Sequence, residues 1–209
     1  MEYKIIYSDR STIALQVSRQ GEIIIRAPRK VSKRYIDELV VSKSDWIQSK
    51  VNTITRYGFS FLEGDTLLYL GEKYTLKFSK NSKVEVTDDS IIVPDSMDVE
   101  HLKNWFKFKA EKLMIPRFKK LAKDYNYKNI RLSNARTRYG SCNGKGNINL
   151  SWRLIFAPLF VIDYVILHEL VHIEHMNHSS QFWNKMEQTM PNYKTAKKWL
   201  KENNVISML

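Results

Sequence analysis

The chain has 209 residues, of which 43% are hydrophobic and 12% aromatic, enough apolar sequence for one folded domain or two small ones. Its 34 lysines and arginines outnumber 22 aspartates and glutamates, and the formal net charge of +12 favours acidic partners or substrates, nucleic acid among them. The lysines are scattered along the chain, which is also typical of a solvated surface. Wholesale disorder is excluded by the ordinary apolar content.

The longest apolar run, residues 154–171, is interrupted by a proline and by charged and polar residues. It does not predict a membrane span, which takes about 20 apolar residues. No apolar segment of a secretory signal is visible near the N-terminus. The single cysteine, Cys142, excludes an internal disulfide framework. These features predict a cytoplasmic protein without a membrane partner, and they leave its oligomeric state open.

The first part of the chain reads as a small β structure followed by a helix. Residues 3–8, 12–18 and 22–27 are rich in strand-forming residues and predict an antiparallel meander. Ser32 is typical of a helix N-cap, and the apolar spacing after it predicts a helix over residues 33–56.

A second β set is predicted before a long helix over residues 97–125, in which Pro116 should kink or split the helix. The turn at residues 94–96 is the best boundary. It predicts a β-rich N-terminal domain with one helix, 1–95, and a second domain, 96–209. The strands of the second set are predicted at 66–70, 73–79, 83–87 and 90–93.

The second domain alternates strands and helices. Residues 129–133 and 147–155 predict a hairpin or two adjacent strands. Helices are predicted over 159–176, over 181–190 with a serine cap, and from Pro191 to about Asn203.

The strongest functional signal is the run 165–183, which contains four of the chain's five histidines. His168 and His172 bracket Glu169 in the order H-E-x-x-H, inside an apolar segment that predicts a helix. Residues four apart share a helix face, so both imidazoles can bind one zinc ion at about 2.0–2.1 Å. Glu169 then points to the side of the ion, where it can deprotonate a water. The pattern predicts a zinc hydrolase with Glu169 as general base.

A catalytic zinc site needs a third protein ligand. His175 continues the same helical stripe, which would put three imidazoles in a row. His178 lies beyond Asn177, a residue that tolerates the left-handed conformation that ends helices, so His178 can approach the ion from outside the helix. We expect His178 to be the ligand and His175 to be a neighbour, with Phe182 and Trp183 packed behind His178.

The run 136–183 resembles the YgjP-like metallopeptidase-domain family, which is related to the SprT-like and minigluzincin zincins. The R-W-G-S-C element of that family appears as residues 138–142, with Tyr139 in place of tryptophan. Its H-E-x-x-H…N-H-S-x-x-F-W element appears as residues 168–183. The resemblance is specific over the C-terminal half and general over the N-terminal half. Metzincins have a glycine where His175 stands, which argues against that class.

The resemblance implies an α+β, zincin-like (minigluzincin-type) second domain, with zinc on His168, His172 and His178 and with Glu169 catalytic. In zincins of this type, the strand before the metal helix edges the cleft and pairs with an extended peptide, and residues 147–155 match that strand. Candidate substrate-binding residues follow from these elements, namely Arg136, Arg138, Tyr139 and Asn149.

We therefore predict a zinc-dependent hydrolase, specifically a metallopeptidase that acts on a peptide or protein substrate. Two alternatives stay open. One is a metal-dependent hydrolase of nucleotide phosphoanhydrides, since the same activated water and the positive charge suit such substrates. The other is a DNA-associated module with a structural zinc, which a closed fourth ligand such as His175 would support.

Overall fold

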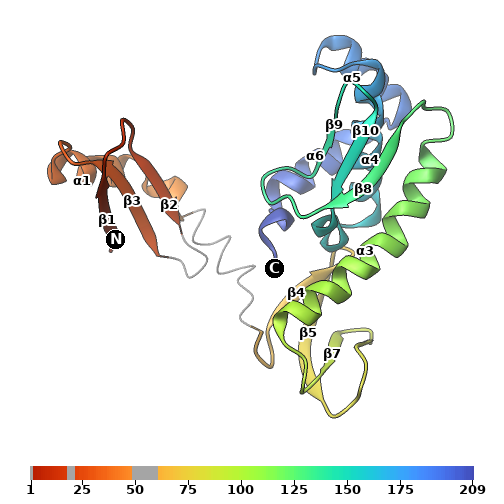
Figure 1. Cartoon of the computed structure of the whole chain (residues 1–209), viewed down its shortest axis with the longest axis horizontal. Coiled ribbons are helices and arrows are strands. Elements are labelled where there is room, and N and C mark those ends of the chain that lie inside the picture. The colour runs from red at the N-terminus through yellow and green to blue at the C-terminus, as the bar shows by residue number, and fades with distance from the viewer. Residues whose placement is uncertain (1, 18–21, 49–60) are drawn as a thin grey trace. The chain divides into compact units, whose positions relative to one another are not determined.

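The computed structural model describes residues 2–17, 22–48 and 61–209 of the chain and has a mixed α+β architecture (Figure 1). The chain divides into two compact units, Met1–Gly58 and Phe59–Leu209, which are described separately below. Among the described residues, no helix has the length and apolar character that a membrane crossing requires.

The first unit is built on a three-stranded sheet in the order β1-β3-β2. The central strand pairs in parallel with β1 and antiparallel with β2, so the predicted antiparallel meander is wrong. The physical reason is burial. Strand β3 is the most buried of the three, through Ile23, Ile25 and Ala27, and the most buried strand takes the central position, where both of its edges are paired. The strands are β1 Lys4–Ser8, β2 Ala14–Val17 and β3 Ile23–Pro28.

Helix α1, Lys33–Ser42, covers this sheet. Its predicted cap is confirmed, since the Ser32 side chain accepts a hydrogen bond from the Tyr35 backbone N–H. Ile36 and Val40 on the helix share one core with the buried residues of β3. The remainder of the helix predicted to residue 56 is helical over 44–48 and then lies outside the described residues.

The second unit begins with a four-stranded sheet in the order β4-β5-β7-β6, in which β5 and β7 are parallel. All four strands of the predicted second β set are present. They are β4 Thr66–Tyr69, β5 Glu72–Ser79, β6 Glu85–Val86 and β7 Ser90–Pro94.

Helix α3, Val99–Leu121, follows and runs unbroken through Pro116, so the predicted split does not occur. A proline inside a helix removes one backbone hydrogen bond. Here the buried stripe continues on both sides of it, and burial of Met114 and Phe118 outweighs that loss. The Asp98 side chain caps the helix by accepting from the His101 backbone N–H.

A three-stranded sheet and a bundle of helices form the rest of the unit. The sheet order is β8-β10-β9, so β10 is interior, parallel to β8 and antiparallel to β9. Two arrangements were predicted for β8 and β10. The prediction of adjacent strands is confirmed, and the hairpin is wrong, because a tight turn joins only antiparallel strands and these two are parallel. The strands are β8 Asn129–Ser133, β9 Gly140–Cys142 and β10 Asn147–Ser151.

Helix α4, Leu159–Glu174, packs against α3, α5, α6 and β9, and Figure 1 shows it behind β10. An Arg117–Asp163 ion pair ties it to α3, with 2.7 Å between Arg117 Nη2 and Asp163 Oδ2. The short helix η1, Trp152–Phe156, ends the predicted 147–155 strand early. The remaining helices are α5 Ser180–Thr189, α6 Tyr193–Glu202 and η2 Val205–Ser207.

The turn between β4 and β5 is bonded to η1. The backbone N–H groups of Leu70 and Gly71 donate to the carbonyls of Ile155 and Phe156 at 2.9 and 3.1 Å. The β4–β7 sheet therefore belongs with the C-terminal helices. This differs from the boundary predicted at residues 95/96, since the compact units meet between Gly58 and Phe59.

Candidate metal centre

Three histidine side chains converge at the C-terminal end of α4. His168 and His172 lie one turn apart on the helix and are partly buried, whereas His178 is exposed on the loop before α5. One nitrogen from each ring lies within 4.8 Å of the others. The Nε2 atoms of His168 and His178 are 3.0 Å apart. Ligand nitrogens of a tetrahedral zinc site at about 2.0–2.1 Å from the ion would be about 3.3 Å apart, so this spacing fits one shared ion.

The chain leaves α4 through His175, whose backbone is extended at φ −132° and ψ 91°. Asn177 is not among the residues of the described chain that have a positive φ, so it does not adopt the left-handed conformation that its residue type allows. The His175 carbonyl accepts a hydrogen bond from His172 Nδ1 at 3.0 Å. Since a carbonyl only accepts, His172 carries its proton on Nδ1 and leaves Nε2 free to bind a metal.

Aromatic rings hold the exposed His178 in place. The Trp183 ring stacks on its imidazole, with 5.6 Å between centroids and 22° between planes. Phe182 is fully buried and contacts all three imidazoles, with centroid distances of 4.6 to 4.9 Å. The expected packing of both rings behind His178 is thus confirmed.

The pKa values of His168 and His178 suit metal binding, which needs neutral imidazoles. Burial, together with the neighbouring His172 and His178, lowers the pKa of His168 to about 3. Burial also lowers the pKa of His178. His168 Nδ1 is buried without a hydrogen-bond partner among the described residues, unlike the corresponding atom of His172. The donor set fits a divalent transition-metal ion with at least one position left for another ligand.

Glu169 is 5% exposed and lies against β9. Burial raises the pKa of its carboxyl to about 8, and the positive charge of Arg138 opposes this rise. A Cβ atom on Gly140 would come within 2.5 Å of Glu169 Oε1 and 2.8 Å of its Cδ. Gly140 therefore lets β9 approach the Glu169 carboxyl closely. The sequence did not predict this contact, although the glycine of the R-Y-G-S-C element was a signal for it.

Strand β10 is interior and β9 is an edge strand of the sheet, which corrects the expectation that residues 147–155 form the edge of the cleft. Tyr139 and Asn143, which flank β9, both bond to β10: the Tyr139 carbonyl accepts from the Ser151 N–H, and the Asn143 N–H donates to the Asn147 carbonyl. Because hydrogen-bonding direction alternates along a strand, the backbone groups of Gly140 and Cys142 face away from β10. Glu169 lies against one face of this edge strand, at Gly140.

The four predicted substrate-binding residues lie in different surroundings. Arg138 is exposed and acts electrostatically on Glu169. Arg136 donates to the Leu209 main-chain oxygen at 3.5 Å. Burial raises the pKa of Tyr139 to about 12, against the effect of a backbone hydrogen bond with Ile206. On β10, Asn149 Nδ2 donates to Ser141 Oγ at 3.4 Å. Only Arg138 of the four is brought next to Glu169 by these contacts.

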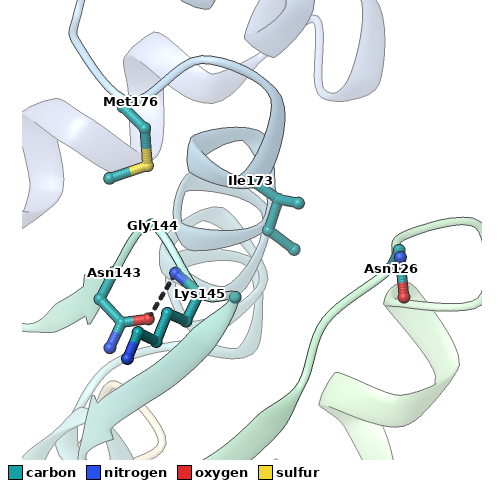
Figure 2. A pocket seen from close by; sticks show the side chains of 7 residues that line it. Asn126, Asn143, Gly144, Lys145, Ile173 and Met176 are labelled. Carbon is teal, nitrogen blue, oxygen red and sulfur yellow. Dashed lines mark hydrogen bonds between the residues drawn. The ribbon is translucent and has the colours of Figure 1, made fainter.

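A pocket of about 270 Å³ opens at the end of α4. Figure 2 shows Met176, which follows α4, over the turn 143–146 between β9 and β10, and Ile173 on the side of α4 toward Asn126. The Lys145 backbone N–H donates to Asn143 Oδ1 at 3.0 Å, which fixes the turn. The pocket is lined by the turn that follows Cys142, by the end of α4 and by Asn126.

Two further features of the second unit carried no sequence signal. Arg153 is 1% exposed, and its guanidinium donates to the main-chain oxygens of Met208 and Leu209, both at 3.0 Å. On α6, Lys197 lies 4.2 Å from the centre of the Trp183 ring. Both contacts join segments that are distant in sequence.

The model of the YgjP-like metallopeptidase domain matches residues 11–203, nearly the whole chain. The chain belongs to the YgjP-like family. Membership places it among proteins with a metallopeptidase domain, for which a bound metal is expected at family level, and the three histidines are the group of described residues suited to hold one.

No curated protein sequence matches this YgjP-like chain. Among solved structures, it is similar to the metallopeptidase zymogen of Pyrococcus abyssi abylysin, at 21% identity and a TM-score of 0.37. The match covers 44% of this chain and 93% of that one. At this level of similarity, nothing about the activity of abylysin carries over.

Proposed function

We propose that this YgjP-like protein is a zinc-dependent metallopeptidase with a zincin-like catalytic unit, in which Glu169 activates the attacking water. One observation carries the proposal. Three imidazole nitrogens, from His168, His172 and His178, lie within 4.8 Å of one another, and the residue that follows His168 on the same helix is the buried Glu169. This donor set leaves an open position, as catalytic zinc sites do.

Zinc held by the three histidines would supply a Lewis acid that polarises the scissile carbonyl and acidifies a water. Glu169 would take the proton from that water and return it to the leaving amine. Its burial keeps competing water away, and Arg138 limits the rise of its pKa. His172 is kept in the metal-binding tautomer by the His175 carbonyl.

The open edge of β9 offers a docking site for an extended peptide. The outward backbone groups of Gly140 and Cys142 can pair with a substrate strand, which gives affinity with little sequence preference. A peptide bound there would lie along Glu169 and continue into the pocket lined by Ile173 and Met176. This arrangement favours peptide substrates over compact ones.

The structural-zinc alternative requires a fourth protein ligand. Among the described residues, the group suited to metal binding contains three histidines, and His175 is not one of them. The hydrolysis of nucleotide phosphoanhydrides has no comparable observation in its favour and serves as an arm of the experiment.

The test combines metal analysis with activity. Wild type and Glu169→Gln are loaded with zinc and assayed against a peptide library and a nucleotide panel. We expect one bound zinc in both proteins, peptide cleavage by wild type, and a loss of about 10²- to 10⁴-fold in kcat for Glu169→Gln, the range of general base catalysis. Turnover of nucleotides alone, or full activity in Glu169→Gln, would overturn the proposal.

Two histidine variants serve as matched controls for the ligand set. His178→Ala should lose zinc affinity, measured by competition with a chelator. His175→Ala should keep it, because its contribution to the site is a backbone carbonyl that the substitution retains. Equal affinities of the two variants would remove His178 from the ligand set.

A further inference from the structure

Lys197 lies beside the metal centre without taking part in it. Its Nζ is 4.2 Å from the centre of the Trp183 ring, which stacks on His178 at 5.6 Å. Trp183 also stacks on Tyr193, one turn before Lys197 on α6, with 5.4 Å between centroids and 21° between planes. A cation over an aromatic face is held by the ring's electrostatic field. These rings therefore restrain the Lys197 ammonium group close to His178.

The carboxylates of the neighbouring helices pair with other lysines. Glu187 of α5 lies 3.4 Å from Lys194 Nζ, and Glu202 of α6 lies 3.9 Å from Lys198 Nζ. Over the described ranges, no ion pair within 4.0 Å involves Lys197. Its side chain is exposed, so an incoming anion can reach it.

The charge of Lys197 lies close to the metal centre, because its Nζ is over the Trp183 ring and that ring stacks on His178. A divalent ion on three neutral imidazoles would bring two more positive charges next to this ammonium group. Like charges at such range repel each other, and an anion that contacts both relieves the repulsion.

We propose that Lys197 binds a carboxylate of the substrate next to the scissile bond. The protein then prefers peptides with an aspartate or glutamate close to the cleaved bond, or peptides whose free C-terminus lies there. Both sources offer the same chemistry, and the experiment separates them. The inference rests on the peptidase function proposed above and adds a substrate class to it.

The experiment uses the full-length, zinc-loaded protein and matched peptides. In one set, each peptide carries a single Glu, or Gln in its place, at one of four positions: the two residues before the cleaved bond and the two after it. A second set ends two residues after that bond, with a free or an amidated C-terminus. For wild type we expect kcat/KM to be about fivefold to tenfold higher for the carboxylate member at one position, as for a charged hydrogen bond at an exposed site.

Three variants isolate the role of Lys197. Lys197→Gln should remove the preference, mainly through KM, because the carboxylate contact exists before and during reaction. Lys197→Arg should retain it. Lys198→Gln is the matched control. It removes the same charge one residue further along α6, and Lys198 is already paired with Glu202. It should leave the preference unchanged.

The outcomes separate the two proposals. Wild type that cleaves no peptide overturns the peptidase function and this inference with it. Wild type that cleaves Glu and Gln peptides equally overturns only the inference. A Lys197→Gln variant that slows every peptide alike through kcat also overturns it, because Lys197 would then act on the reacting group and not on a substrate carboxylate.

Discussion

Gly140 is the residue at which β9 comes close enough to Glu169 to exclude a side chain. An added Cβ would lie 2.5 to 2.8 Å from the Glu169 carboxyl group and its Cγ. Gly140→Ala should therefore displace the carboxylate. We expect kcat on peptides to fall about 10²-fold, the cost of misplacing a catalytic group by about 1 Å. Steady-state kinetics on the zinc-loaded protein check this.

Gly144 provides the control for this substitution. A Cβ there would meet nothing within 4 Å, although the residue lies in the turn that follows β9. Gly144→Ala should keep wild-type zinc content and melting temperature, and it should not show the loss of kcat expected for Gly140→Ala. If both alanine variants were equally active, Gly140 would not position Glu169.

At the residue scale, spacing along one helix was sufficient to predict His168, His172 and Glu169, because i and i+4 positions share a face in any helix. His178 followed from the need for a ligand outside that helix. Gly140 and Lys197 could not be predicted in the same way. Their roles depend on β9 and α6 packing against α4, and local sequence does not encode which elements meet.

At the scale of elements, the contact between the β4–β5 turn and the start of α4 joins the β4–β7 sheet to the helix that carries His168 and His172. Gly71 has φ +88°, and a Cβ there would lie 2.4 Å from Pro158 Cγ. Gly71→Ala should lower the free energy of unfolding by about 1 kcal/mol for the left-handed backbone and by about 1–3 kcal/mol more for the clash. Urea denaturation measures the sum.

Gly64 separates the two contributions. Its φ is +85°, but a Cβ there meets nothing within 4 Å. Gly64→Ala should show the backbone cost alone, about 1 kcal/mol. A loss for Gly71→Ala no larger than that for Gly64→Ala would mean that Pro158 yields without cost.

Periodicity predicted most strands and helices of this chain, because burial of one face imposes a repeat on each element. It did not predict how the strands pair. In both three-stranded sheets, the strand that comes last in sequence is central, β3 in one and β10 in the other. Pairing order depends on which strand is apolar enough to be covered on both edges, and that is a property of the assembled sheet.

At the scale of the whole molecule, Tyr139 connects β9 to the C-terminal segment near Ile206. Burial raises the pKa of its phenol to about 12, above the ordinary value near 10. The folded state therefore holds this proton more tightly than the unfolded chain. The stability it contributes is fully present below pH 10 and should be lost as pH rises from 10 towards 12.

Tyr139→Phe tests this pH dependence, because it removes the titrating hydroxyl and keeps the ring. Urea denaturation at intervals between pH 9 and pH 12 should give a steeper fall in unfolding free energy for wild type than for the variant. Parallel curves would mean that Tyr139 does not titrate in this range in the folded protein.

Domain organisation was the part of the whole-molecule prediction that differed most from the structure. The change from strands to helices near Pro94 is a real change in composition, yet the β4–β7 sheet bonds to η1 through Leu70 and Gly71. A composition shift locates where element types change. It does not reveal which elements share a core.

The brevity of β9 also bears on how these molecules behave at high concentration. An uncovered strand edge invites pairing with the same edge of another molecule, and long edges lead to aggregation. Strand β9 spans only Gly140–Cys142, with two residues whose backbone faces outward. Such a short edge offers few hydrogen bonds, so we expect it to be too weak to pair two copies of the chain, whereas the proposed peptide substrate would have the metal as a second contact.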